Sequence, residues 1–174
     1  MRRNFSVWQF GGFIAVSLMG VLLHFLYDWT GESVIIAPFS GVNESTWEHM
    51  KLLFFPLFIF ALIESRFFKD YENFWCVKLA GSTAGLLAIP ILFYTYIGAF
   101  GKSPDRLNIM IFFISAALVF LLESRLFKKE SFSCKNPKIA FGLFCGIGLL
   151  FVVFTFFAPK IPLFEDPLTG RYGI

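Results

Sequence analysis

The chain has 174 residues, of which 57% are hydrophobic and 20% aromatic, and its mean hydropathy is +0.71. Soluble domains are typically about half apolar, so this composition excludes an ordinary soluble domain and indicates a protein embedded in a membrane. The net charge is only +3, and the Lys and Arg residues lie at the ends of apolar runs, which excludes a nucleic-acid-binding protein.

Five apolar runs are long enough to cross a membrane, since a spanning helix needs about 20 residues. We therefore expect an all-α integral membrane protein of about five transmembrane helices, forming a single transmembrane domain over residues 1–174. The expected spans are residues 10–26, 47–68, 74–100, 107–127 and 139–158. The first run lacks the small-residue cleavage site of a signal peptide, so we expect it to remain as a helix.

Between the first two spans, HFLYDWTGESVIIAPFSGVNESTWEHMK gathers the polar groups that an enzyme would use. His24 and Asp28 are four residues apart and would share one face of a helix, and His49 follows Glu48 directly. Imidazoles and carboxylates suit Zn, Mn or Fe, so we expect His24, Asp28 and His49 as metal ligands. Glu44 or Glu48 would then act as general base in a metal-dependent membrane hydrolase.

The same residues have a structural interpretation, which the sequence leaves open. Ser45-x-x-Glu48 is a helix capping box, and Glu48 can pair with Lys51 three residues later. The apolar segment VIIAPFSGV is too short to span a membrane and could fold over the helix ends as a lid. No established catalytic motif accompanies the polar groups, so enzyme chemistry is a hypothesis.

An internal repeat follows, because LIESRFFK at residues 62–69 recurs as LLESRLFK at residues 121–128. Two spans separate the copies, which favours one helix followed by two repeated helix hairpins. The next spans carry the small-residue pairs Gly81-x-x-x-Gly85 and Gly142-x-x-x-Gly146. Such pairs let membrane helices approach closely.

The repeated glutamates lie where a membrane span should be apolar. The uncharged run of residues 52–63 covers only roughly 18 Å, so ionisable groups must enter the membrane at one of its ends. Charges inside a membrane are usually paired or functional. We expect Glu64 to pair with Arg125 and Glu123 with Arg66; the alternative is that the two glutamates form a proton or cation relay.

Basic residues predict which side each loop faces. With the N-terminus inside, ten of the 15 Lys and Arg residues lie on the inner side. These are Arg2, Arg3, Arg66, Lys69, Lys78, Arg125, Lys128, Lys129, Lys135 and Lys138, whereas Lys51, Lys102, Arg106, Lys160 and Arg171 lie outside. The asymmetry favours a cytoplasmic N-terminus and an extracytoplasmic C-terminus.

Three cysteines, Cys76, Cys134 and Cys145, are odd in number and lack CxxC spacing. We therefore expect them to behave as small hydrophobic residues and to form neither a disulfide framework nor a zinc site.

The motifs HFLYDWTG and VNESTWEHMKLLFFP, with the weaker LIESRFF, resemble a family of small bacterial multi-pass membrane proteins that has no assigned function. The resemblance covers most of the chain and supplies no catalytic residues. Together with the charge asymmetry, it implies a bacterial inner membrane. We expect the protein to carry a polar, metal-binding pocket on its extracytoplasmic face. The alternatives are a structural or partner-binding scaffold and a small transporter that uses the paired glutamates. Membrane lipids are the expected partners, and a protein partner or homo-oligomer is left open.

Overall fold

The computed structural model describes residues 2–68, 71–101, 104–129 and 132–174, so Lys69 and Lys102 lie outside the described residues. These residues form five helices and no strand, which confirms the all-α fold. The helices are α1 (Arg2–Trp29), α2 (Thr46–Glu64), α3 (Phe74–Phe100), α4 (Asp105–Lys128) and α5 (Pro137–Phe156), followed by the short 3-10 helix η1 (Pro162–Phe164). All five α-helices are long and apolar enough to cross a membrane.

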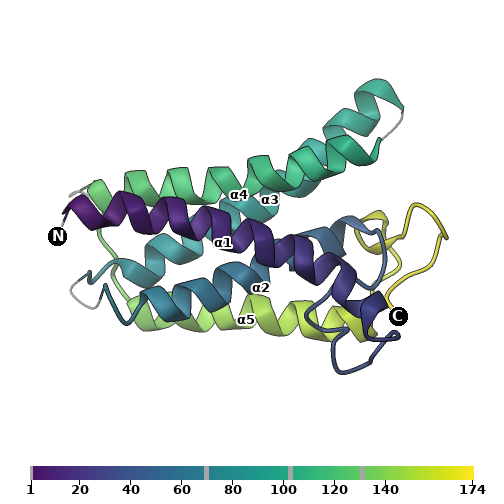
Figure 1. Cartoon of the computed structure of the whole chain (residues 1–174), viewed down its shortest axis with the longest axis horizontal. Coiled ribbons are helices and arrows are strands. Elements are labelled where there is room, and N and C mark those ends of the chain that lie inside the picture. The colour runs from purple at the N-terminus through teal and green to yellow at the C-terminus, as the bar shows by residue number, and fades with distance from the viewer. Residues whose placement is uncertain (1, 69–70, 102–103, 130–131) are drawn as a thin grey trace.

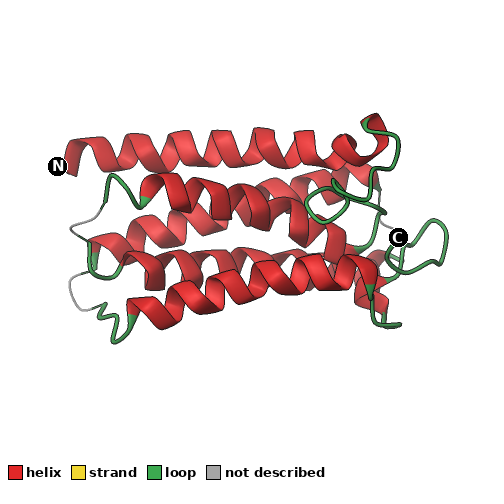
Figure 2. Cartoon of the chain, turned by 90° about the horizontal axis from the view of Figure 1, so that it is seen from below, coloured by secondary structure: helices red, strands yellow, loops and turns green. Residues whose placement is uncertain are grey.

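The five helices form an elongated bundle in which successive helices run in opposite directions (Figures 1 and 2). The two chain termini therefore lie at opposite ends of the bundle. The amino end of the bundle also holds the α2–α3 and α4–α5 connections, whereas the carboxyl end holds the α1–α2 and α3–α4 connections and the tail. Helix α2 contacts all four of the other α-helices and is the central helix of the bundle.

Helix α2 is shorter than its expected span of residues 47–68. Helix α2 begins as the capping box predicts, because the Ser45 hydroxyl accepts a hydrogen bond of 3.3 Å from the Glu48 N–H. It ends at Glu64, so the first copy of the repeat leaves the helix within the motif, whereas the second copy is helical to Lys128. The two copies thus differ in local structure, and the proposed repeat of two hairpins finds no support.

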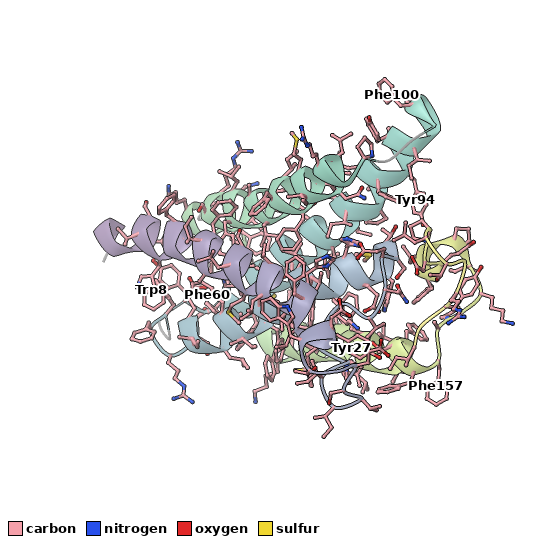
Figure 3. The ribbon with its side chains drawn as sticks, turned by 45° about the vertical axis from the view of Figure 1, so that its right-hand side comes forward. Trp8, Tyr27, Phe60, Tyr94, Phe100 and Phe157 are labelled. Atoms are coloured by element: carbon pink, nitrogen blue, oxygen red, sulfur yellow. A yellow bond between two sulfur atoms is a disulfide. The ribbon has the colours of Figure 1, made fainter. Side chains whose placement is uncertain are left out.

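Aromatic side chains fill the spaces between helices, as Figure 3 shows. Trp8 on α1 lies 6.1 Å from Phe60 on α2 between ring centroids. Of the two small-residue pairs, only the first lies at a close helix crossing: a Cβ atom at Gly85 would overlap the Val119 side chain of α4. A Cβ atom at Gly146 would have no neighbour within 4 Å. The small residues therefore bring α3 against α4 and not α5 against a neighbour.

The expectation for the cysteines was wrong, because Cys76 and Cys134 form a disulfide with their Cα atoms 5.9 Å apart. Cys76 lies in the first turn of α3, and Cys134 lies in the α4–α5 connection, 58 residues later. The Asn73 side chain joins the same two segments, since its carbonyl oxygen accepts a 2.9 Å hydrogen bond from the Cys134 N–H. Cys145 is a free thiol. The two bonded cysteines meet because both segments lie at the amino end of the bundle.

Candidate functional site

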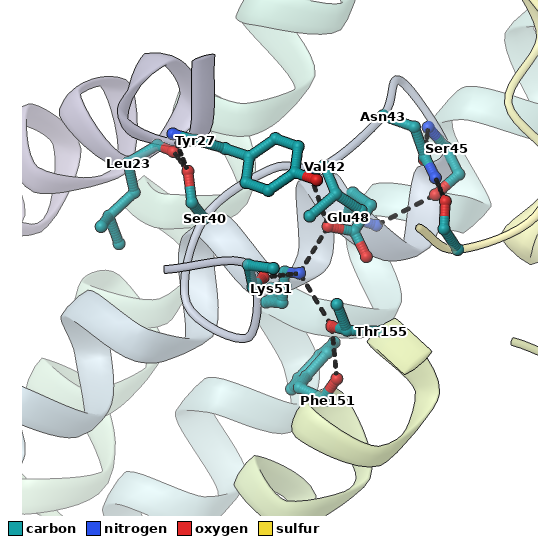
Figure 4. A network of polar contacts seen from close by, with 12 residues as sticks. Leu23, Tyr27, Ser40, Val42, Asn43, Ser45, Glu48, Lys51, Phe151 and Thr155 are labelled. Atoms are coloured by element: carbon teal, nitrogen blue, oxygen red, sulfur yellow. Dashed lines mark hydrogen bonds and ion pairs between the residues drawn. The ribbon is translucent and has the colours of Figure 1, made fainter. Parts of the chain in front are cut away.

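A buried ion pair lies at the carboxyl end of the bundle (Figure 4). The Lys51 ammonium contacts the Glu48 carboxylate at 2.5 Å, which confirms the expected pairing at three-residue spacing. Lys51 also donates to the Thr155 hydroxyl of α5 at 2.9 Å and to the Ala37 carbonyl at 2.8 Å. Both ionic side chains are almost fully buried, with exposed fractions of 0% and 2%. Burial of this kind is favourable only when every charge and donor is satisfied, as it is here.

The α1–α2 connection folds over this ion pair. The Ser40 hydroxyl accepts a hydrogen bond of 2.9 Å from the Tyr27 N–H and donates to the Leu23 carbonyl, which fixes the loop to the end of α1. Because Ala37 supplies its carbonyl to Lys51, the apolar segment that the sequence predicts as a lid covers the ion pair. Its Ile35 side chain is 81% exposed, as expected of a residue that meets lipid.

Next to the ion pair, Glu44 joins the two histidines of the chain. One carboxylate oxygen of Glu44 lies 3.6 Å from His24 Nε2, and the other lies 3.5 Å from His49 Nε2. The imidazole centroids are 5.8 Å apart. All three side chains are partly exposed, which distinguishes this cluster from the buried ion pair. We call His24, Glu44 and His49 the histidine cluster.

The hydrogen bond of His49 determines what the histidine cluster offers to a ligand. His49 Nδ1 lies 2.9 Å from the Ser45 carbonyl oxygen, which can only accept, so the hydrogen of a neutral imidazole is on Nδ1. Nε2 then carries a lone pair and faces a carboxylate oxygen of Glu44. Two acceptors so placed need a shared proton, a hydrogen-bond donor or a cation between them.

The histidine cluster lines a cavity of about 750 Å³. Its other walls are mainly apolar and come from α1, α3, α4 and the tail, including Val21, Phe93, Ile109 and Leu168. Val21 is 43% exposed and Ile109 is 57% exposed, so the cavity is open along the side of the bundle between α1 and α4. Figure 1 shows α3 and α4 diverging from α1 toward this end. Known small-molecule sites have volumes of about 300–1,000 Å³.

A second ionic cluster is buried near the amino end of the bundle. The Lys78 ammonium on α3 contacts the Glu123 carboxylate on α4 at 2.6 Å and also contacts the Glu64 carboxylate on α2. The Gln9 amide on α1 donates to Glu64 at 3.3 Å. Four phenyl rings surround the ammonium at 5.6–6.0 Å from their centroids: those of Phe60, Phe74, Phe120 and Phe127. We call Glu64, Lys78 and Glu123 the buried triad.

The expected site residues are thus distributed over different environments. The structure brings His24, Glu44 and His49 together, whereas Asp28 is exposed beyond the cluster and Glu48 is held by Lys51 and by the Val42 N–H. Glu48 is therefore not the free base that the hydrolase hypothesis needs. In the described parts of the chain, no group of three or more His, Cys, Asp or Glu side chains is arranged to hold a metal ion.

The arginines of the repeated motifs do not occupy the expected places. Arg66 and Arg125 are exposed, and within the described ranges the ion pairs of Glu64 and Glu123 are those with Lys78. The uncharged run of residues 52–63 is shorter than the thickness of a membrane, and the structure explains why this is tolerated. Lys51 and Glu64, at the two ends of the run, are both buried against protein.

Sequence reasoning missed three residues of these sites: Gln9, Lys78 and Thr155. Lys78 was counted as an interfacial charge, although it lies inside the expected span of residues 74–100. A cation inside a span is the signal that would have indicated a partner for the two glutamates. Thr155 and Gln9 gave no such signal, because polar uncharged residues are common in membrane helices.

The chain belongs to the family described as "Family of unknown function (DUF6512)", whose model matches residues 1–174. No curated protein and no solved structure matches the chain. The family model thus spans the whole chain.

Proposed function

We propose that this member of the family is an integral membrane protein that binds an amphipathic molecule in the cavity at the carboxyl end of the bundle. The cavity is the observation that supports this most strongly. Its walls are mainly apolar, its polar groups are gathered in the histidine cluster, and it is open at the side of the bundle, where lipid would lie. A molecule dissolved in the membrane would enter with its hydrocarbon part between α1 and α4.

The histidine cluster favours one kind of polar end group. Glu44 offers only acceptor oxygens, and His49 Nε2 offers a lone pair because Nδ1 donates to Ser45. A hydroxyl would donate its one hydrogen to either acceptor and an amino group could donate to both, whereas a carboxylate or phosphate would face the negative charge of Glu44. The proposed ligand is therefore a long-chain alcohol, amine or similar lipid rather than a fatty acid.

Filling the cavity tests the proposal. Ile109→Trp places a large ring in the wall of the cavity, so a co-purifying molecule should be lost or reduced by at least about tenfold, a change of about 1.4 kcal/mol. Native mass spectrometry of the detergent-purified protein measures the fraction of protein that carries a bound molecule. The matched control is Ile114→Trp, which changes a similarly exposed isoleucine of α4 outside the cavity.

Equal amounts of bound molecule in the Ile109→Trp and Ile114→Trp proteins would contradict the proposal. A wild-type protein that carries no molecule and binds neither a long-chain alcohol nor an amine would contradict it too. Such a protein would favour the alternative of a structural or partner-binding scaffold.

A divalent metal is the second candidate for the histidine cluster, whose side chains would have to rearrange to hold it. The contact of His49 Nδ1 with the Ser45 carbonyl favours it, because metal-bound histidines commonly donate their other N–H to a backbone carbonyl. Elemental analysis after loading with Zn, Mn or Fe should then find metal in the wild type and in Glu32→Ala, and none in Glu44→Ala. Protein that stays free of metal under all three loadings would remove this candidate.

We propose that the histidine cluster faces the extracytoplasmic side of a bacterial inner membrane. The support is the ten against five distribution of Lys and Arg, which favours a cytoplasmic amino end. The disulfide favours the opposite orientation, because Cys76 and Cys134 lie at the amino end of the bundle and the cytoplasm keeps thiols reduced. In this orientation we expect both cysteines to be thiols in the cell and to join only under oxidising conditions.

Thiol labelling of intact cells distinguishes the two orientations. In a protein whose three cysteines are replaced by serine, Lys160→Cys should react with a membrane-impermeant maleimide in intact cells. Lys129→Cys, at the opposite end, should react only after lysis. Both lysines are exposed, so access to the reagent depends on the side of the membrane. The reverse labelling would place the disulfide in the oxidising compartment and overturn the proposed orientation.

A further inference from the structure

The buried triad carries unequal numbers of opposite charges. Glu64 and Glu123 are each 0% exposed and Lys78 is 2% exposed, so all three groups are shielded from water. If both carboxyl groups were ionised, the triad would hold one uncompensated negative charge inside the bundle. A buried charge without a partner is strongly unfavourable.

Among the residues that the structure describes, no further cation pairs with the two glutamates. The nearest arginines in the chain, Arg66 and Arg125, are exposed, and within the described residues the ion pairs of the two glutamates involve Lys78 alone. From α1, the group that faces the triad is the neutral amide of Gln9. The other neighbours of the Lys78 ammonium are the four phenyl rings, which carry no charge.

The hydrogen bonds of the triad also indicate that a proton is missing. Glu123 Oε1 and Gln9 Oε1 are both buried acceptors without a hydrogen-bond partner. Buried acceptors are rarely left without a donor, because each one costs the free energy of its lost hydration. A carboxylic acid O–H on either glutamate would supply a donor to this group of acceptors and would also cancel the extra negative charge.

We infer that Glu64, Lys78 and Glu123 form a proton-binding site, in which the two carboxyl groups share one exchangeable proton. With that proton bound, the triad consists of one ammonium, one carboxylate and one carboxylic acid, and its net charge is zero. The site is separate from the histidine cluster, so it does not depend on the proposed ligand. A buried carboxyl that holds an exchangeable proton is the group that proton-coupled membrane proteins use.

Buried hydroxyls continue from the triad toward the cavity. Among the described residues, three buried serine hydroxyls have no hydrogen-bond partner: those of Ser17, Ser82 and Ser115. At 1.5 Å rise per residue, Ser82 lies about 6 Å along α3 from Lys78, and Ser115 lies about 12 Å along α4 from Glu123.

Infrared difference spectroscopy tests the inference in the full-length protein in detergent. The wild type should show the carbonyl stretch of one buried carboxylic acid at neutral pH, with a shift in D₂O. Glu64→Gln and Glu123→Gln should each abolish this band, because the one remaining carboxyl then forms a neutral pair with Lys78 and ionises. Both variants keep an ion pair and so should fold. Glu32→Gln changes an exposed glutamate and should leave the band unchanged.

Loss of the band in both single variants supports a shared proton. Persistence of the band in either Glu64→Gln or Glu123→Gln would overturn the inference, since the proton would then belong to one group regardless of the other. A wild-type spectrum without a carboxylic acid band would also overturn it, because both glutamates would be ionised.

Discussion

Lys78→Met is expected to destabilise the bundle by about 3–5 kcal/mol, the range found when one partner of a buried ion pair is removed. The substitution leaves Glu64 and Glu123 buried without a cation. Methionine fills a similar volume, so the loss reflects charge and not a cavity. Thermal unfolding in detergent, followed by fluorescence-detected size-exclusion chromatography, measures the change.

The control for this prediction separates charge from packing. Lys128→Met removes an exposed lysine and should change stability by no more than about 0.5 kcal/mol. Adding Glu64→Gln and Glu123→Gln to Lys78→Met removes both carboxyl groups and with them the unpaired negative charge, so it should recover most of the lost stability. If the triple variant were as unstable as Lys78→Met alone, packing rather than charge would explain the loss.

Lys51→Met is expected to cost a similar amount, about 3–5 kcal/mol, at the other end of the bundle. It leaves the Glu48 carboxylate buried and deprives the Ala37 carbonyl of its donor. Because Ala37 belongs to the α1–α2 connection, we also expect this loop to become accessible to protease. Thermal unfolding and limited proteolysis measure the two effects.

Thr155→Val gives the matched comparison, since it removes only one of the groups that accept from Lys51. Its expected cost is about 1 kcal/mol, the usual contribution of one hydrogen bond. A Thr155→Val protein as unstable as Lys51→Met would indicate that the hydrogen bond to Thr155, and not the Glu48–Lys51 ion pair within α2, accounts for the stability lost in Lys51→Met.

Local features of the sequence were sufficient to predict the helices and the contacts between residues that are close in sequence. Apolar runs predicted five helices, and the spacing from Ser45 to Glu48 predicted the start of α2. The Glu48–Lys51 pair was also predictable, because three residues of helix bring the two side chains together. These interactions depend on spacing within a single helix.

Contacts between distant residues were not predictable from spacing. Lys78 joins two glutamates on other helices, and Cys76 meets Cys134 only through the arrangement of the whole bundle. The repeated ESR motifs suggested that each glutamate pairs with the arginine of the other copy, yet both arginines are exposed and both glutamates contact Lys78. The histidine cluster was predicted in part: its members were named, but the loop that places Glu44 between His24 and His49 was not.

Photo-crosslinking tests the proposed ligand site most directly. A long-chain alkyl amine with a diazirine in its chain would be incubated with the purified protein, irradiated and mapped by mass spectrometry. The proposal predicts label on cavity residues such as Val21 and Ile109, competition by an untagged long-chain alcohol, and loss of label in Ile109→Trp. Even labelling of exposed residues remote from the cavity, such as Leu121 and Leu149, without competition, would contradict the proposed binding site.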